Sequence, residues 1–405
     1  MRGSAAVARY SLAEVATYAT AAPADSAYTT LLSVEGTPES QRVQASDPVA
    51  VANLRGNIHP DVATHRHSTL PGIVIPTYGG NVAFDGAGGD SPPARQHVEK
   101  CLQSLFGTDG ANAFAGNTIA SGGGAGVTAP LKLTDSTGLV ATAGIYVAGE
   151  FAVVKEVDGQ DVTLFHDLVG GIPADGTPVY GSRVYSPTMG DRAKYHYLNE
   201  ERANGEGYTH GPGRFDTGGL SGLGAGGALK WNFTFLSNDW TDTPVNVASY
   251  PANEFTADPV VAAAGKVAIN GVATCIADGS INFGIKHARV PCATGTNGFD
   301  GIELVAPVEP VINVSEYSST TRMTQYRGRT GIPVLVGFSN GSTNATRARH
   351  SIAVFLPNAQ VMTNPGAVAD LRGLATQFVG RDPTPAQVAA GIDKSIYLYV
   401  FGGRA

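Results

Sequence analysis

The clearest alternation of apolar and polar positions lies between residues 128 and 187. A period of two is typical of strands that bury one face. Asp158-Gly159 lies between two of the alternating stretches and is a strong hairpin signal. Four or five short strands in this length predict a small β-barrel of SH3-like size. The stretches are APLKLTDS, GIYVAGEFAVVKEVDG, QDVTLFHDL and GTPVYGSRVYSP.

The strongest helical pattern follows Ser91-Pro92-Pro93. Serine is a preferred N-cap and proline is tolerated in the first turn, so a helix is predicted over about residues 92–106. Gly107 is expected to end it. Because the helix has a single apolar stripe, it must pack on a sheet or barrel. The stripe consists of Val98, Cys101, Leu102, Leu105 and Phe106.

Further β-like segments flank this region. Residues 66–84 contain two short apolar runs separated by Thr77-Tyr78-Gly79-Gly80, which predicts a turn. Residues 190–227 are rich in Gly, His and Tyr and are interpreted as a loop. The terminal strand KSIYLYVFGG is expected to pair with a preceding hydrophobic strand. Other strands are predicted in ALKWNFTFLSNDW, VAINGVATCIADGSINFGIKHARV, ELVAPVEPVINVSEY, GIPVLVGFS and RHSIAVFLPNAQVM, with LRGLATQFV in a linker.

These patterns predict a mainly β protein with three parts. Residues 1–55 are rich in Ala, Ser and Thr and are interpreted as an N-terminal arm or extended segment, with room for one or two helical turns within 11–20. Residues 56–127 and 188–405 are expected to form a β-sandwich or barrel core that carries the helix. Residues 128–187 form the inserted small β-barrel module.

The composition supports packed cores but supplies few charges. Of 405 residues, 42% are hydrophobic and 15% are charged, below the roughly 25% of typical soluble domains. Such a chain covers its surface with small polar residues or buries that surface against copies of itself. The net charge of −7 argues against tight nucleic-acid binding, yet it suits a wall that DNA passes without sticking.

The cysteines and the N-terminus indicate no secretion. Cys101, Cys275 and Cys292 give neither a disulfide framework nor a zinc site, and buried free thiols are favoured over a Cys275–Cys292 bridge. The N-terminus has no signal-peptide core, and no run approaches the ~18 apolar residues of a membrane span. We expect a protein that is made in the cytoplasm and stays soluble.

Two patterns resemble ligand sites without the required context. Gly222–Gly227 matches G-x-G-x-x-G, but a dinucleotide site needs a following helix, and the strand-like KWNFTFL follows instead. A loop or a Gly-lined subunit contact is favoured. His59, His65 and His67 cluster with Asp61 nearby, and in a strand His65 and His67 would share one face at metal-ligand spacing. No second ligand set matches them, so a structural or interface role is favoured.

The case for catalysis is weak. Ser121 and Ser221 lie in Gly-rich loops without the strand-to-helix elbow that exposes a nucleophilic serine. Cys101 lies on the apolar helix face, where thiols are inert. Glu200-Glu201 is interpreted as solvated surface and not as a pair of glycosidase carboxylates. We predict that the protein is not an enzyme and has no catalytic, cofactor-binding or metal-binding residues.

A basic cluster near the C-terminus leaves two interpretations open. Aromatic residues among arginines are typical of a nucleic-acid face. A surface that pairs with acids on a neighbouring copy is at least as well supported, because Asp and Glu outnumber Lys and Arg in the chain. The cluster comprises Arg322, Arg327, Arg329, Arg347 and Arg349, with Tyr317 and Tyr326 interleaved.

A β run followed by a helix ending at Leu105-Phe106-Gly107 resembles the core of the major tail tube proteins of tailed bacteriophages with long non-contractile tails. The strand pair VATCIADGSINFG and the terminal NAQV…SIYLYVFGG extend the likeness. The segment GEFAVVKEVDGQDVTLFHDL…GIPADGTPVYGSR resembles the small β module inserted in larger members of that family. The resemblance covers about residues 66–405 and is a likeness of pattern, since the family has no diagnostic motif.

The resemblance implies a structural virion protein with a β-sandwich or barrel tail-tube core and a flanking helix. Homohexameric rings would self-assemble into a hollow tail tube around the tape measure protein, and DNA would pass through it during ejection. The other implied partners are the tail terminator and the tail tip or baseplate proteins, with no membrane and no cofactor. The location would be the virion tail, after synthesis in the bacterial host cytoplasm. The inserted module would lie outside the tube and be dispensable for assembly.

Two alternatives stay open. One is another virion structural protein, such as a capsid decoration protein, tail terminator or baseplate component, which would assemble without forming a tube. The other is a carbohydrate-binding or hydrolytic β protein, which would be a monomer with an aromatic cleft.

Overall fold

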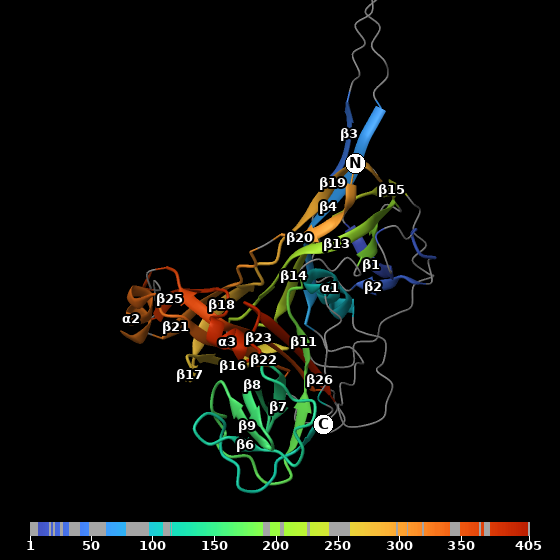
Figure 1. The fold of residues 1–405 in the computed structure, drawn as a ribbon. Coiled ribbons are helices and arrows are strands. Elements are labelled where there is room, and N and C mark those ends of the chain that lie inside the picture. Colours follow the sequence, from blue (N-terminus) through green and yellow to red (C-terminus); the bar gives the residue numbers. More distant parts are fainter. Residues whose placement is uncertain are drawn as a thin grey trace, which may run out of the picture.

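The computed structural model describes most of the chain. The described residues are 7–15, 18, 21–24, 27–31, 41–47, 62–77, 97–107, 114, 116–188, 195–202, 206–224, 227–242, 260–296, 299–305, 307–317, 320–340, 349–363, 366–367 and 373–403. As predicted, the fold is mainly β (Figure 1). The described strands form antiparallel sheets of 18, 6 and 2 strands.

Strand β13 (Gly207–Ser221) is the centre of the largest sheet. One of its edges pairs with β12 (Tyr195–Arg202) and, further along, with β18 (Ile276–Asn282). The other edge pairs first with β15 (Trp240–Asp242) and then with β14 (Lys230–Ser237). Two strands therefore occupy most of the segment that the sequence suggested was a loop.

The loop interpretation of residues 190–227 is wrong because its glycines serve close packing. Gly218 lies beneath the helix, and a Cβ atom there would collide with Leu105 and lie 3.1 Å from Phe283. A glycine-rich stretch is a poor strand by propensity, but here glycine is what lets a helix approach the sheet. Tertiary packing outweighs local propensity at this position.

Replacing Gly218 with valine is expected to lower the free energy of unfolding by about 1–3 kcal/mol or more, because the new side chain overpacks the core under the helix. Urea denaturation would measure the loss. The matched comparison is Gly218→Ala with Gly337→Ala, since a Cβ atom at Gly337 would lie at an ordinary 3.4 Å from Ala353. A Gly218→Ala protein as stable as the Gly337→Ala protein would contradict this packing.

Five further strands extend the sheet beyond β18, namely β21 (Val311–Tyr317), β22 (Ile332–Ser339), β23 (Arg349–Val361), β25 (Gly373–Gly380) and β26 (Tyr397–Gly403). β21 joins β18 to β25. β23 pairs with β22 along one edge and with both β25 and β26 along the other. The predicted pairing of the terminal aromatic strand is thus confirmed. The linker assigned to LRGLATQFV is wrong, since β25 pairs on both edges and buries Phe378.

The predicted helix is confirmed as α1 (His97–Phe106), and residues 92–96 lie outside the described part. All five residues of its apolar stripe are buried in the largest hydrophobic cluster, with residues of β4 (Val62–Pro76), β13, β14, β22, β23 and β26. Gly107 ends the helix at a φ of 75°, where its N–H donates to the Gln103 carbonyl at 2.8 Å. Only glycine adopts that conformation without strain.

The interpretation of residues 1–55 as an arm is wrong for the described residues. β1 (Val7–Val15) pairs with β12 and with β2 (Thr29–Leu31), so this segment belongs to the main sheet. No helical turn forms within the described part of 11–20. Tyr10 and Leu12 are fully buried, which anchors β1 in the core. Ser11 and Ala13 are buried as well, so this part of β1 lacks the exposed polar face by which a strand is recognised in a sequence.

A six-stranded sheet occupies residues 117–181, starting before the predicted boundary at 128 and containing more strands than expected. The hairpin at Asp158-Gly159 is confirmed, because Asp158 pairs with Asp161 across a two-residue turn. The sheet surrounds its own hydrophobic cluster. Its strands are β5 (Asn117–Thr118), β6 (Leu131–Lys132), β7 (Gly144–Val147), β8 (Glu150–Asp158), β9 (Asp161–Leu164) and β10 (Pro178–Gly181).

This six-stranded unit docks on the outer face of β22, β23 and β26 through aromatic residues. The Tyr146 ring stacks on Phe401 with centroids 5.0 Å apart, and the Phe165 and Phe355 centroids lie 4.6 Å apart. The Tyr399 hydroxyl donates to the Thr142 carbonyl at 2.7 Å. Lys266 also forms an ion pair with Glu150 across this interface. The unit is therefore packed against the core and not merely tethered to it.

Two β-hairpins extend from the opposite end of the molecule (Figure 1). One consists of β3 (Gln41–Asp47) and the outer half of β4. The other consists of β19 (His287–Thr296) and β20 (Phe299–Leu304). The first predicted β run thus forms β4, which ends at Pro76 just before the predicted turn, while the second run at 81–84 lies outside the described residues.

Four of the remaining elements, β11, β16, β17 and β24, are strands of the largest sheet, and the other two are the helices α2 and α3. None of the described helices is long and apolar enough to cross a membrane. Helices α2 and α3 had no counterpart in the sequence-based expectation. These elements are β11 (Arg183–Tyr185), β16 (Val261–Ile269), β17 (Val272–Thr274), β24 (Gly366–Ala367), α2 (Thr320–Gly328) and α3 (Pro385–Ala389).

Candidate functional site

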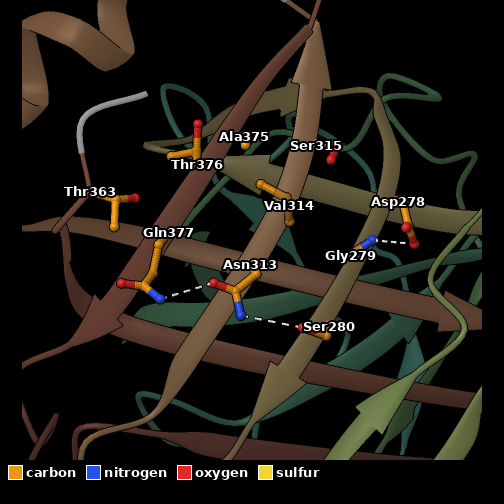
Figure 2. Close-up of a pocket in the computed structure, with 10 residues that line it drawn as sticks. All are labelled: Asp278, Gly279, Ser280, Asn313, Val314, Ser315, Thr363, Ala375, Thr376 and Gln377. Atoms are coloured by element: carbon orange, nitrogen blue, oxygen red, sulfur yellow. Dashed lines mark hydrogen bonds between the residues drawn. The ribbon is translucent and has the colours of Figure 1, made fainter. Parts of the chain in front are cut away.

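A polar depression of about 360 Å³ lies on the face of β18, β21 and β25 that points away from the core (Figure 2). A ladder of side chains crosses the three strands in register. The Gln377 amide donates to Asn313 Oδ1 at 3.1 Å, and the Asn313 amide donates to Ser280 Oγ at 3.3 Å. The alternate residues Ile281, Ile312 and Phe378 are buried on the other face.

The chemistry of this depression is limited to hydrogen bonding. Asp278 is the only charged residue in its lining, and its carboxylate accepts the Gly279 N–H at 2.7 Å. The described lining contains no histidine, cysteine or aromatic residue. A base–nucleophile pair and a stacking platform are therefore both missing from this site. Its amides and hydroxyls suit contact with another polar surface.

A second cluster has the connectivity of a catalytic triad but no access. The Ser68 hydroxyl lies 2.7 Å from His210 Nδ1, and His210 Nε2 lies 3.1 Å from Glu200 Oε2. All three side chains are 0% exposed, and Ser68 Oγ also lies 2.8 Å from Ser237 Oγ. A nucleophilic hydroxyl must be able to reach a substrate carbonyl. Here the surrounding strands cover the Ser68 hydroxyl, so no substrate can approach it. The cluster instead links β4, β12, β13 and β14 by buried polar contacts.

The expectation that Glu200 lies on a solvated surface is therefore wrong. Its carboxylate is fully buried, and besides the histidine it accepts Nε–H of Arg202 at 3.1 Å. A buried carboxylate needs such partners, because removing an unpaired charge from water is costly. The adjacent Glu201 is only partly exposed. The partners of Glu200 come from the hairpin formed by β12 and β13, which the loop interpretation had hidden.

Buried histidines are expected to make the protein acid-sensitive. Burial and the nearby Arg214 guanidinium lower the pKa of His287 to about 3, against about 6.5 in the unfolded chain. Between these values the unfolded chain binds a proton that the folded chain does not. The free energy of unfolding should therefore fall as pH drops from about 6.5 toward 3, by about 1.4 kcal/mol per pH unit. Burial also lowers the pKa values of His166 and His210, which adds to the fall.

Urea unfolding at a series of pH values would measure this effect. His287→Gln removes one titrating group and should flatten the dependence, whatever it does to stability at neutral pH. Equal unfolding free energies at pH 6.5 and pH 4.5 would contradict the buried, neutral state of these histidines.

Cation–π contacts fix the base of the β3–β4 hairpin. The guanidinium carbon of Arg42 lies 3.5 Å from the centroid of the Tyr208 ring, and that of Arg66 lies 4.6 Å from the centroid of Trp240. Arg289 further ties the second hairpin to the sheet, donating to the Ser68 carbonyl at 2.6 Å. Both hairpins are thus held firmly where they leave the main sheet.

Of the three clustered histidines in the sequence, the structure describes the side chain of His67. The described residues hold no group of three or more His, Cys, Asp or Glu placed to bind a metal ion. His67 packs edge-on against Phe299 at 5.8 Å, a contact between the two hairpins. The backbone of His65 belongs to β4, but its side chain lies outside the described part. His59 lies outside the described part altogether.

The other singled-out residues have structural surroundings. Gly222 and the described part of the glycine motif connect two strands, so no helix receives a phosphate there. Ser221 accepts the Asn232 amide at 2.9 Å, and Ser121 lies in a turn. Burial raises the pKa of the Cys101 thiol, which keeps it protonated and inert. All three cysteines remain thiols, but Cys275 is exposed and Cys292 half-buried, which corrects their expected burial.

The basic cluster divides into an inner and an outer part. Arg322 is buried and donates to both Glu316 oxygens, at 2.8 and 3.1 Å. Arg327 and Arg329 are exposed at the end of α2. The side chains of Tyr317 and Arg349, and all of Arg347, lie outside the described residues.

No model of a known protein family and no curated protein matches this chain.

Proposed function

We propose that this protein is a structural subunit that assembles with copies of itself, and that the assembly is the tail tube of a bacteriophage. The observation that carries the self-assembly is the pair of projecting hairpins. In the described part of the chain, no strand pairs with the outer edge of β3. The same holds for residues 62–66 of β4 on the edge opposite β3. The strands β19 and β20 form a two-stranded sheet of their own.

Two-stranded ribbons are marginal in water, and their open edges are templates for further strand pairing. A neighbouring copy that adds a strand would satisfy these backbone groups. Cation–π contacts and Arg289 hold the hairpins in position before assembly, which lowers the entropy lost on association. The same features fit poorly with a monomeric enzyme, whose sheet edges are normally short or covered.

Exposed apolar side chains add to this support. Val169 and Ile172 lie on the six-stranded unit and are 62% and 67% exposed, and Val272 at the turn after β16 is 65% exposed. A chain with only 15% charged residues also has few of the charges that keep surfaces apart. Both properties are expected of a subunit that buries much of its surface against its neighbours.

The ring number and the tube follow from the resemblance of the sequence to tail tube proteins. A heterologous contact with a six-fold rotation closes a ring, and stacking along the axis leaves the assembly open. The tape measure protein would fill the lumen, and the tail terminator and tip proteins would bind the ends. A capsid decoration or baseplate protein would use the same edges but would not form an open tube.

Sedimentation velocity across a concentration series tests the self-assembly directly. The proposal predicts a transition from the 41.6 kDa chain to large species as concentration rises. Electron microscopy of those species separates the two virion roles, because only the tail tube predicts hollow rods. A chain that sediments as a monomer throughout the series would contradict the proposal.

A further inference from the structure

Three arginines from two segments of the chain line a depression of about 380 Å³ at the end of α2. Arg327 and Arg329 come from the last turn of α2 and the residue after it, and Arg381 follows β25. Tyr326 and Met362 supply apolar surface to the same depression. Arg381 is 54 residues beyond Arg327 in the sequence, so it was not part of the basic cluster predicted from the sequence.

The charges in this depression are incompletely paired. Arg381 donates to Glu309 at 3.0 Å. In the part of the chain that the structure describes, Arg327 and Arg329 have no acidic partner. Three guanidinium groups and one carboxylate leave two positive charges around a concave surface, in a chain whose net charge is −7.

The backbone at Arg329 is held in an unusual conformation. Its φ is 49°, in the left-handed region that glycine favours. Gly328 immediately precedes it, yet the left-handed position is occupied by the arginine. The Gln360 amide donates to the Arg329 carbonyl at 3.1 Å, and the Arg329 N–H donates to the Tyr326 carbonyl at 3.4 Å. These contacts fix the backbone from which the Arg329 side chain extends over the depression.

We infer that this arginine pocket binds a phosphate dianion. Guanidinium groups present planar forks of N–H donors that match phosphate oxygens. The two uncompensated positive charges match a phosphate dianion better than a phosphodiester, which carries a single negative charge. The concave shape also fits a compact group better than the backbone of a duplex. Free phosphate and a terminal phosphate on a larger molecule share this chemistry.

Calorimetric titration of the unassembled chain with inorganic phosphate, at ionic strength held constant with sodium chloride, tests the inference independently of assembly. Saturable binding with one phosphate per chain is expected. Arg329→Gly should weaken it by about tenfold or more, since a charge-assisted contact is lost. The same substitution should leave the thermal midpoint unchanged or higher, because glycine adopts this φ without strain. Lys286→Gln is the control, since it removes an exposed positive charge elsewhere and should bind phosphate as the unaltered chain does.

Oligonucleotides separate the two sources of phosphate. A short strand with a 5′-phosphate should compete with inorganic phosphate if the pocket accepts a terminal group, and the same strand without it should not. No saturable binding, or equal binding by the Arg329→Gly and Lys286→Gln variants, would overturn the inference. So would a result in which Arg329→Gly alters assembly while phosphate affinity is unchanged, which would indicate a carboxylate of a second copy instead.

Discussion

Deleting residues 117–181, which form the six-stranded unit, is expected to yield a protein that aggregates instead of a smaller soluble subunit. The deletion would uncover the outer face of β22, β23 and β26, where Phe355, Tyr399 and Phe401 are 0% exposed. Burying each such side chain contributes about 1.5–3 kcal/mol, and an exposed patch of them promotes association. Expression, solubility and dye binding to exposed apolar surface would measure the effect.

A second deletion variant separates docking from assembly. In it, Leu335, Phe355 and Phe401 are replaced by threonine, so that the uncovered face becomes more polar. If the six-stranded unit only decorates the assembly, this variant should be soluble and should still assemble. A folded, soluble variant that no longer assembles would show that residues 117–181 take part in subunit contacts. A simple deletion that stays soluble and monomeric would contradict the aromatic interface.

Shortening the β3–β4 hairpin is expected to abolish assembly while leaving the fold intact. Gln44 and Arg66 lie directly opposite each other, so replacing residues 45–65 with Asn-Gly closes a two-residue hairpin at that pair. The retained base keeps the contacts of Arg42 and Arg66 with Tyr208 and Trp240. Within the described residues, the removed parts of β3 and β4 pair with each other and with no other strand.

We expect the thermal midpoint to change by a few degrees at most, and the concentration needed for assembly to rise by about a hundredfold or more. Replacing Gly159-Gln160 with Asn-Gly is the control, since it introduces the same two-residue turn at the other end of the molecule without shortening a hairpin. Undiminished assembly of the shortened chain would show that this hairpin is not a subunit contact.

Local patterns predicted the elements whose partners are near in sequence. The helix α1 and the hairpin at Asp158-Gly159 carry caps, turns and periodicity that need no distant residue. β13 was missed because its strand character depends on what packs over it. Gly218 weakens a strand in isolation but is required beneath Leu105. Such a position is recognised only once the helix is placed on the sheet.

The candidate sites were missed for the same reason. Ser68 and His210 are separated by 142 residues, and their contact depends on the register of β4, β13 and β14. The arginine pocket likewise depends on the return of the chain along β25, which brings Arg381 beside α2. Charge and composition predicted a surface with few charges that suits contacts between subunits. The register of the sheet decides which side chains lie together on that surface.

Negative-stain electron microscopy of the purified chain, from dilute to concentrated samples, tests the central claim most directly. Hollow rods of uniform width with a regular axial repeat are predicted, and the chain with the shortened β3–β4 hairpin should form none under the same conditions. Uniform particles the size of one 41.6 kDa chain at every concentration would contradict the claim that this protein is a self-assembling subunit.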